Sequence, residues 1–305
     1  MGRLMSVPPA SSIAIPFAVA AFGIALFSTM DAVMKHLALA IGVYNALLWR
    51  TMAGAIFGGA VFFGRRQAWP APRVLRIHLL RGVLSAVMAF LFFWGLARVP
   101  MAQAIALAFV APLIALYLAA LILKEKIARS AVLASLLGFA GVLVILAGQA
   151  RAELGPDAFR GSLAILASAG LYAYNIILMR QQALVAKPVE IAFFMSAIMT
   201  SCFLLAAPLL AVWPPAHELP AILGAAALAF ASLLALSWAY ARAEAQYLAP
   251  TEYTGFLWAA LFGWLVFAEP VRPLTLAGAA MIVAACVIAA RPRQIVQAPQ
   301  VEIGQ

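Results

Sequence analysis

Ten apolar runs of 18 to 24 residues follow one another along the chain, and the breaks between them are short. The runs cover roughly 14–37, 43–64, 78–97, 101–123, 131–149, 160–181, 189–212, 219–240, 246–268 and 273–290. A helix needs about 20 predominantly apolar residues to cross a bilayer. Of the 305 residues, 67% are hydrophobic and only 10% are charged, more apolar surface than a soluble core can hide. The pattern predicts an all-α integral membrane protein with ten transmembrane helices.

The sequence does not fit a β-barrel, a nucleic-acid-binding protein or a protein that needs a nucleotide or metal cofactor. Strands of a membrane β-barrel alternate apolar and polar residues, and these runs do not alternate. The net charge of +10 lies mainly in short loops, where basic residues orient helices, so no nucleic-acid partner is expected. The sequence has no phosphate-binding GxxxxGK[ST] loop and no HExxH zinc pair. Cys202 and Cys286 are isolated inside apolar runs and suggest no metal spacing, so we expect no cofactor and no metal.

The basic residues predict which face of the membrane each loop occupies. Fourteen lysines and arginines fall on one side, with Arg65, Arg66, Arg73, Arg76 and Arg81 crowding the second loop. Five fall on the other side, namely Lys35, Arg98, Arg151, Arg160 and Arg272. Because cytoplasmic loops carry the excess of positive charge, both termini are predicted to face the cytoplasm. A multi-pass protein of a bacterial-type inner membrane is expected.

The two halves of the chain resemble each other. "FFWGLARVP" at 92–100 aligns with "LSWAYARAE" at 236–244, which matches Arg98 to Arg242 at a spacing of 144 residues. The same spacing aligns Glu125 with Glu269, each at the end of an apolar run. These ordered matches predict an internal duplication.

The duplication predicts the domain organisation. Residues 14–150 and 158–291 form two five-helix repeats, between tails at 1–13 and 292–305. Five is an odd number, so the second repeat enters the membrane from the opposite side and is inverted relative to the first. Inverted repeats recur in secondary transporters, where the substrate binds near the membrane midplane.

Four charged residues lie within predicted spans, where charges usually face the bundle interior or a water-filled cavity. Asp31 and Arg50 have similar depths in the outer halves of the first two spans, so an ion pair between them is expected. It is either a structural lock or a gate that also contacts substrate. Lys35, one turn from Asp31, is expected to reach toward the interface. Glu252 is a candidate for binding a proton, a cationic substrate group or a nearby arginine.

Further polar and helix-breaking residues complete the candidate cavity. Pro112 and Pro250 interrupt predicted spans, either as packing kinks or as broken helices that expose backbone near the substrate. The remaining candidates are polar or aromatic residues within spans: Gln103, Tyr174, Asn175 and Tyr253.

The chain resembles the EamA-type transporters of the drug/metabolite transporter superfamily over about residues 14–290. The resemblance rests on the Arg-Gly of the third span, "LARVPMAQA", "APL" and "KEK" in the first half, and "AYARAEAQYLAPTEY" and "AEP" in the second. It implies ten helices in two inverted repeats around a central cavity. Members handle amino acids and their derivatives, S-adenosylmethionine, riboflavin and other metabolites.

These observations predict a secondary active transporter, an exporter or exchanger of a small metabolite, working by alternating access as a monomer or homodimer. Proton coupling is included in this prediction through Glu252. No enzymatic activity is expected. The alternative is a polytopic membrane enzyme that acts on a lipid or isoprenoid substrate.

Overall fold

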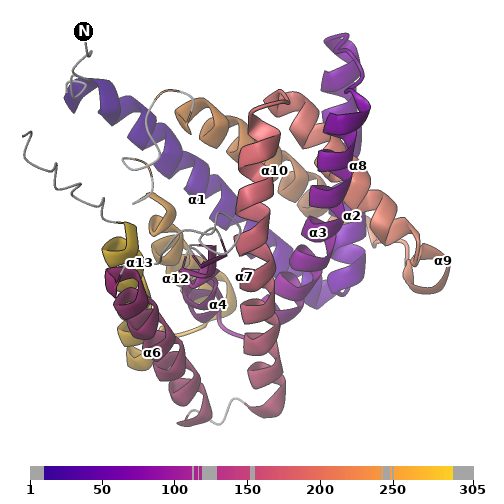
Figure 1. Ribbon diagram of the computed structural model, residues 1–305. Coiled ribbons are helices and arrows are strands. Elements are labelled where there is room, and N and C mark those ends of the chain that lie inside the picture. The colour runs from indigo at the N-terminus through magenta and orange to yellow at the C-terminus, as the bar shows by residue number, and fades with distance from the viewer. Residues whose placement is uncertain are drawn as a thin grey trace, which may run out of the picture.

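The computed structural model describes residues 10–111, 113–115, 117–118, 129–151, 155–240, 242, 248 and 251–290, which form helices and turns without a strand among them (Figure 1). The helices of the first half are α1 (Ala10–Ala40), α2 (Val43–Gly64), α3 (Pro72–Leu96), α4 (Met101–Ala108) and α6 (Arg129–Arg151). Those of the second half are α7 (Gly155–Ala183), α8 (Pro188–Leu204), α9 (Ala207–Leu210), the 3₁₀ helix η1 (Ala216–Glu218), α10 (Leu219–Tyr240), α12 (Thr254–Phe267) and α13 (Pro273–Ala290).

Apolar helices dominate the fold, as the sequence predicts. By length and composition, α1, α2, α3, α7 and the η1–α10 segment each contain a stretch that is able to cross a membrane. Shorter apolar stretches of 10–17 residues occupy α4, α6, α8, α12 and α13. In chain order each of these stretches overlaps one of the predicted runs, and five of them are long enough to cross a membrane. The all-helical membrane architecture is thus confirmed.

Helix α3 begins earlier than the hydropathy of its sequence predicts. Pro72 occupies its first turn, where the missing N–H of proline is harmless and its fixed φ favours a helix. The predicted start at residue 78 is therefore wrong, since the helix begins at residue 72. This earlier start places His78 and Arg81 deeper within the helix instead of at its beginning, and both side chains are buried. Arg81 is thus not one of the loop charges, although the predicted excess of positive charge on that side remains without it.

The contacts between helices follow the duplication. Matching α1, α2, α3, α4 and α6 in order to α7, α8, α10, α12 and α13 pairs ten of the described helices and leaves only the short α9 and η1 without a counterpart among them. The contact of α1 with α10 then corresponds to that of α7 with α3, and the contact of α3 with α8 to that of α10 with α2. The pairs α2–α8, α4–α12 and α6–α13 correspond to themselves. Such an exchange is what a pseudo-two-fold relation between two repeats requires.

The two arginines aligned by the sequence make the same contacts. Arg98 donates through Nη1 to the carbonyl oxygen of Trp94 at 2.8 Å, and its guanidinium lies 3.6 Å from the centre of that indole ring. Arg242 donates to Trp238 O at 3.1 Å and lies 4.0 Å from its ring centre. A guanidinium over an indole is a favourable cation–π arrangement. The equivalence predicted for these two positions is confirmed.

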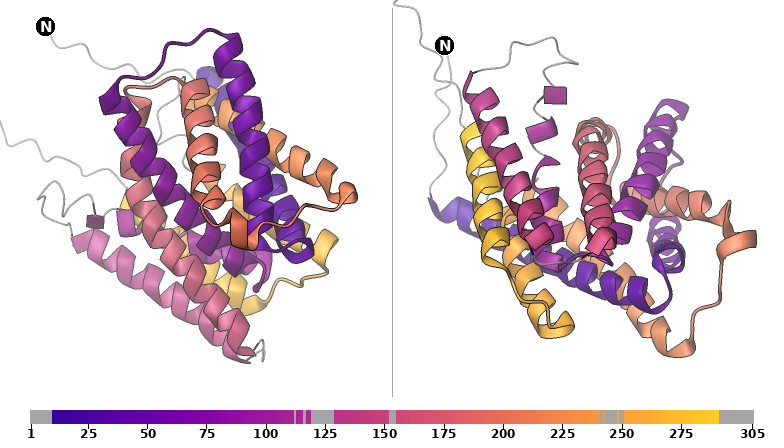
Figure 2. Two further views of the ribbon diagram at one scale, coloured as in Figure 1. Left: turned by 90° about the vertical axis from the view of Figure 1, so that its right-hand side faces the viewer. Right: turned by 90° about the horizontal axis from the view of Figure 1, so that it is seen from below.

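The last helices of the two halves, α6 and α13, pack side by side (Figure 2). Gly141 and Gly278 lie at their contact: a Cβ built on Gly141 would lie 2.7 Å from Gly278 O, and a Cβ on Gly278 would lie 2.6 Å from Gly141 O. Neither position has room for a side chain. Small residues at such contacts let helix backbones approach closely in membranes.

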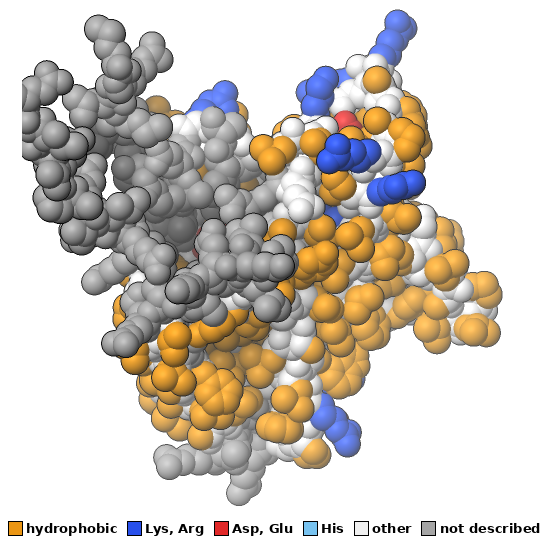
Figure 3. Space-filling model, in the orientation of Figure 1, with side chains coloured by type: hydrophobic (Ala, Val, Ile, Leu, Met, Phe, Trp, Pro, Cys, Tyr) orange, Lys and Arg blue, Asp and Glu red, His pale blue; other side chains and the backbone are white. Residues whose placement is uncertain are grey.

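The surface separates apolar sides from a basic end (Figure 3). Large apolar side chains such as Ile56, Leu133 and Trp264 are exposed on the helix flanks, where lipid would cover them. Exposed basic residues gather where α2 and α7 end and α3 and α8 begin; they are Arg65, Arg66, Arg73, Arg76 and Lys187. This basic end corresponds to the face predicted to be cytoplasmic.

Candidate functional site

Asp31 and Arg50 form a charged centre in the interior of the bundle. Asp31 is 2% exposed and lies about 14 Å from the end of α1, while Arg50 lies about 11 Å from the start of α2. The two charges attract each other. The predicted ion pair is wrong, since no salt bridge or hydrogen bond joins the two side chains in the described part of the chain. Asp31 Oδ1 and Arg50 Nε are both buried without a hydrogen-bond partner. The centre therefore keeps hydrogen-bonding capacity that the protein itself does not use.

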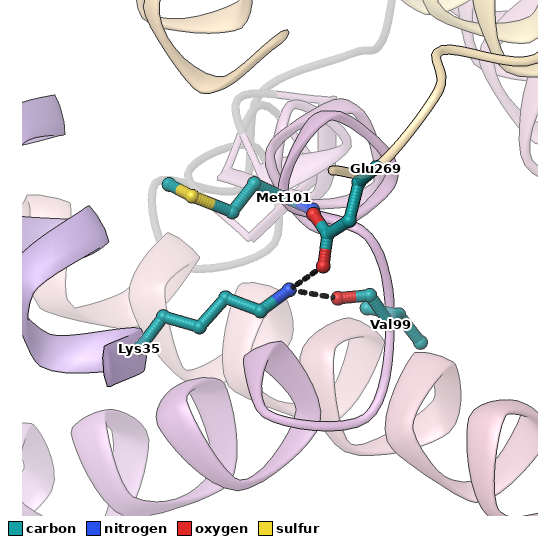
Figure 4. Close-up of polar contacts among 4 residues, drawn as sticks. All are labelled: Lys35, Val99, Met101 and Glu269. Atoms are coloured by element: carbon teal, nitrogen blue, oxygen red, sulfur yellow. Dashed lines mark hydrogen bonds and ion pairs between the residues drawn. The ribbon is translucent and has the colours of Figure 1, made fainter. Parts of the chain in front are cut away.

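Lys35 links the two repeats next to this centre (Figure 4). Its ammonium lies 2.5 Å from Glu269 Oε1 and donates to Val99 O at 2.8 Å. The second carboxylate oxygen of Glu269 accepts a hydrogen bond from the backbone N–H of Met101 at 2.8 Å. The ring of Phe267, 5.1 Å from the Lys35 nitrogen, covers the cation. We call Lys35, Glu269 and the backbone groups of Val99 and Met101 the inter-repeat latch.

The expectation that Lys35 reaches toward the interface is wrong. Its side chain is only 3% exposed, because Glu269 supplies a countercharge inside the bundle. A buried ammonium is favourable only when it is paired and hydrogen-bonded, and Lys35 meets both conditions here.

The local backbone explains how Glu269 reaches this position. Ala268 ends α12 in the left-handed conformation, with φ at 53° and ψ at 33°, which turns the chain back over the helix end. The N–H groups of Ala268 and Glu269 both donate to Gly263 O. A Cβ on Gly263 would lie 3.2 Å from Glu269 Oε2, so glycine leaves room for the carboxylate. The carboxylate then binds Met101 N–H, one of the unpaired donors at the start of α4.

A second polar centre joins α3 to α7 and α8. Arg81 Nε donates to Asn175 Oδ1 at 3.1 Å, and Arg81 Nη1 donates to Gln182 Oε1. Gln182 Nε2 lies 2.5 Å from His78 Nδ1, and His78 Nε2 lies 3.0 Å from Glu190 Oε1. The sequence singled out only Asn175 of these five.

The other predicted site residues are dispersed. Gln103 is buried and donates to Ser162 Oγ at 3.2 Å, which ties α4 to α7. Tyr253 packs edge-to-face on Phe109, with ring centres 5.4 Å apart.

Tyr174 is partly buried on α7, and Glu252 is exposed just before α12. Pro112 and Pro250 lie outside the described residues. Among the described residues, no cluster of three or more histidine, cysteine or acidic side chains could hold a metal ion.

Two candidate residues, Glu269 and Arg81, carry little signal in the sequence, for different reasons. Glu269 aligns with Glu125 at the spacing of the repeat, but nothing in the sequence pairs it with Lys35. Arg81 lies near the start of the run at 78–97, where a basic residue suggests the edge of a loop, whereas the proline at residue 72 is a helix-start signal that places it more than two turns inside the helix.

The comparisons with known proteins agree with the fold. The EamA-like transporter family model matches residues 14–147 and 159–291. The pseudopaline exporter of Pseudomonas aeruginosa is 27% identical over 88% of this chain and 93% of its own length. Riboflavin transporters of Brucella anthropi and Vibrio cholerae are 29% and 30% identical, each over 68% of this chain and over 74% and 68% of their own lengths.

A crystal structure of a protein that is 22% identical covers 92% of this chain and 97% of its own, with a TM-score of 0.57, and supports the fold alone. The family match spans both repeats and nearly the whole membrane region. The chain therefore belongs to the EamA-like transporter family of the drug/metabolite transporter superfamily.

Proposed function

We propose that this protein is a secondary active transporter that exports or exchanges a small polar metabolite by alternating access. The observation that carries the proposal is the contact between Lys35 of the first repeat and Glu269 of the second. Alternating access needs contacts between repeats that close one face and break when that face opens. The latch lies one helical turn from Asp31, on the side predicted to face outward.

The proposed binding site is the centre formed by Asp31 and Arg50. Polar atoms buried without partners are costly unless a ligand or water satisfies them. A carboxylate and a guanidinium together suit a solute that carries both a cationic and an anionic group. With the latch closed, such a solute would reach the centre from the cytoplasmic side, and opening of the latch would release it outward.

The names of the relatives support transport and leave the substrate open. One relative exports pseudopaline and others transport riboflavin. The export direction proposed here draws on the first of these. A multi-pass inner-membrane location with both termini in the cytoplasm belongs to the same proposal, as does the absence of enzymatic activity.

Reconstitution into liposomes tests the proposal. Proteoliposomes would be incubated with a metabolite extract, and the solutes inside would be identified by mass spectrometry. We expect at least one solute to accumulate unchanged, and to do so also with the Arg160→Gln variant, since the partner of that exposed arginine among the described residues is the exposed Asp157. Appearance of a chemically altered product without net movement of solute would favour the membrane-enzyme alternative.

A further inference from the structure

Arg81 is a buried cation well inside the bundle. It follows Pro72, the first residue of α3, by nine positions, which is about 14 Å along the helix. Its relative exposure is 9%. Charges at this depth of a membrane protein are costly and mark functional sites by default, with a partner to be identified.

The partners that Arg81 has in this structure are neutral. Its two hydrogen bonds go to the side-chain amides of Asn175 and Gln182 on α7. No carboxylate among the described residues lies within ion-pair distance of the guanidinium, as the salt bridges of that part of the chain show. Amide oxygens orient a guanidinium and satisfy its donors, but they do not neutralise its charge.

The direction of the hydrogen bonds keeps the acid on α8 away from Arg81. Arginine only donates, so Gln182 Oε1 must accept and Gln182 Nε2 must donate. His78 Nδ1 is therefore the acceptor, and the ring carries its proton on Nε2, which donates to Glu190. The His78 ring is further fixed by stacking on Phe194, with ring centres 4.9 Å apart. Glu190 is thus engaged by His78, and two neutral groups separate it from the guanidinium.

Tyr172 and Glu252 also lie near Arg81. Tyr172 interacts electrostatically with both Arg81 and Glu252, so the three groups lie near one another. Tyr172 is 37% exposed and Glu252 is also exposed. A guanidinium that is held by two side-chain amides, and that has no carboxylate in ion-pair contact among the described residues, is suited to binding an oxyanion through two parallel hydrogen bonds.

We infer that Arg81 binds a carboxylate or phosphate group of the transported solute, which makes the solute an organic anion or a zwitterion. The site lies in the half of the bundle predicted to face the cytoplasm, apart from the Asp31–Arg50 centre. The inference rests on the proposed transport function for the identity of the ligand. The oxyanion site itself rests on the geometry of α3 and α7.

Thermal melting of the purified protein in detergent tests the site without any transport step. Sodium succinate and inorganic phosphate are the two probes, each titrated at constant ionic strength against sodium chloride. We expect one or both probes to raise the melting temperature of the wild type. The same rise is expected in the control variant Arg76→Gln, because Arg76 is exposed and lies five residues before Arg81 on the same helix. The shift should disappear in Arg81→Gln. In Arg81→Lys, which keeps the charge but not the two-pronged geometry, binding should be roughly tenfold weaker.

Each outcome decides the inference. A wild type that responds to neither oxyanion overturns it, as does an Arg81→Gln variant with an unchanged response. If Arg81→Gln does not fold, Arg81→Lys is decisive, and equal affinity in that variant overturns the site. Oxyanion binding through Arg81 in a protein that moves no solute would support the site and contradict the proposed function. Conversely, solute transport with an unchanged KM in Arg81→Lys would contradict the site alone.

Discussion

Lys35 and Glu269, 234 residues apart in sequence, lie 2.5 Å apart and connect the two repeats of this transporter-family protein. The same carboxylate also holds the backbone at Met101, so one acidic side chain bridges α1, the turn before α4 and the end of α12. This concentration of contacts on one residue makes the latch sensitive to single substitutions.

Removing the latch should open the side of the bundle predicted to face outward. Ser28 is buried on α1 beneath the latch and faces Gly255 of α12. In a background lacking native cysteines, we expect Ser28→Cys to react slowly with a membrane-impermeant thiol reagent. Adding Lys35→Met and Glu269→Gln together should speed labelling severalfold. Labelling at the same rate with and without the latch would show that it is not a gate.

Substitutions at Asp31 and Arg50 should separate a structural lock from a substrate contact. Asp31→Asn or Arg50→Gln alone leaves one buried charge uncompensated and should destabilise the protein by about 3 kcal/mol. The double variant should recover much of this stability. If the centre binds substrate, transport stays lost in the double variant. Transport that recovers together with the melting temperature would identify the pair as a lock.

Arg98 and Arg242 should contribute equally and independently to stability. Each makes one hydrogen bond and one cation–π contact with the tryptophan four residues earlier. We expect Arg98→Gln and Arg242→Gln each to lower the unfolding free energy by about 0.5–1 kcal/mol. The double variant should show the sum within about 0.5 kcal/mol, since the residues share no partner. Denaturation in detergent measures the unfolding free energy of the two single variants and of the double variant. A strongly non-additive loss in the double variant would contradict the independence of the two arginines.

Glu252 should determine the pH dependence of transport. The residue is exposed just before α12, interacts electrostatically with Tyr172, and is the proton-binding residue in the proposed transport cycle. Glutamine cannot bind a proton there, and Glu252→Gln should therefore make solute flux nearly independent of pH. Asp157→Asn, at an exposed residue in the first turn of α7, serves as the control. An unaltered pH profile in Glu252→Gln would exclude this residue as the proton site.

Single cysteines should place the basic end of the bundle in the cytoplasm. We expect Arg76→Cys and Gln305→Cys to be shielded from an impermeant reagent in intact cells and Arg160→Cys to react. Labelling of residues 76 and 305 from different sides of the membrane would contradict two five-helix repeats in inverted orientation.

Much of the architecture follows from local patterns. Runs of apolar residues predict the helices, and the alignment of Arg98 with Arg242 predicts a repeat whose contacts the structure confirms. These signals are strong because each depends on neighbouring residues or on a fixed spacing. Hydropathy predicts the start of α3 too late, because it detects only apolar residues. The helix begins at Pro72, whose fixed φ favours the first turn of a helix, and continues through the charged Arg73.

The candidate site depends on contacts that one sequence does not encode locally. The pairing of Lys35 with Glu269 requires the packing of α1 against α12 and the left-handed turn at Ala268. Alanine rarely adopts that conformation, so the turn had no sequence signal. The position of the Arg81 side chain likewise depends on its hydrogen bond to Gln182, which in turn contacts His78. No motif in the sequence marks Gln182 or His78 as its partners.

The glycine contact between α6 and α13 has a consequence for how the protein moves. Where two backbones touch with no side chain between them, sliding one helix along the other would drive Cα and carbonyl atoms of successive residues into collision. These two helices are therefore expected to stay packed as one stiff unit. In the proposed alternating access, the remaining helices would then rock against this stationary pair.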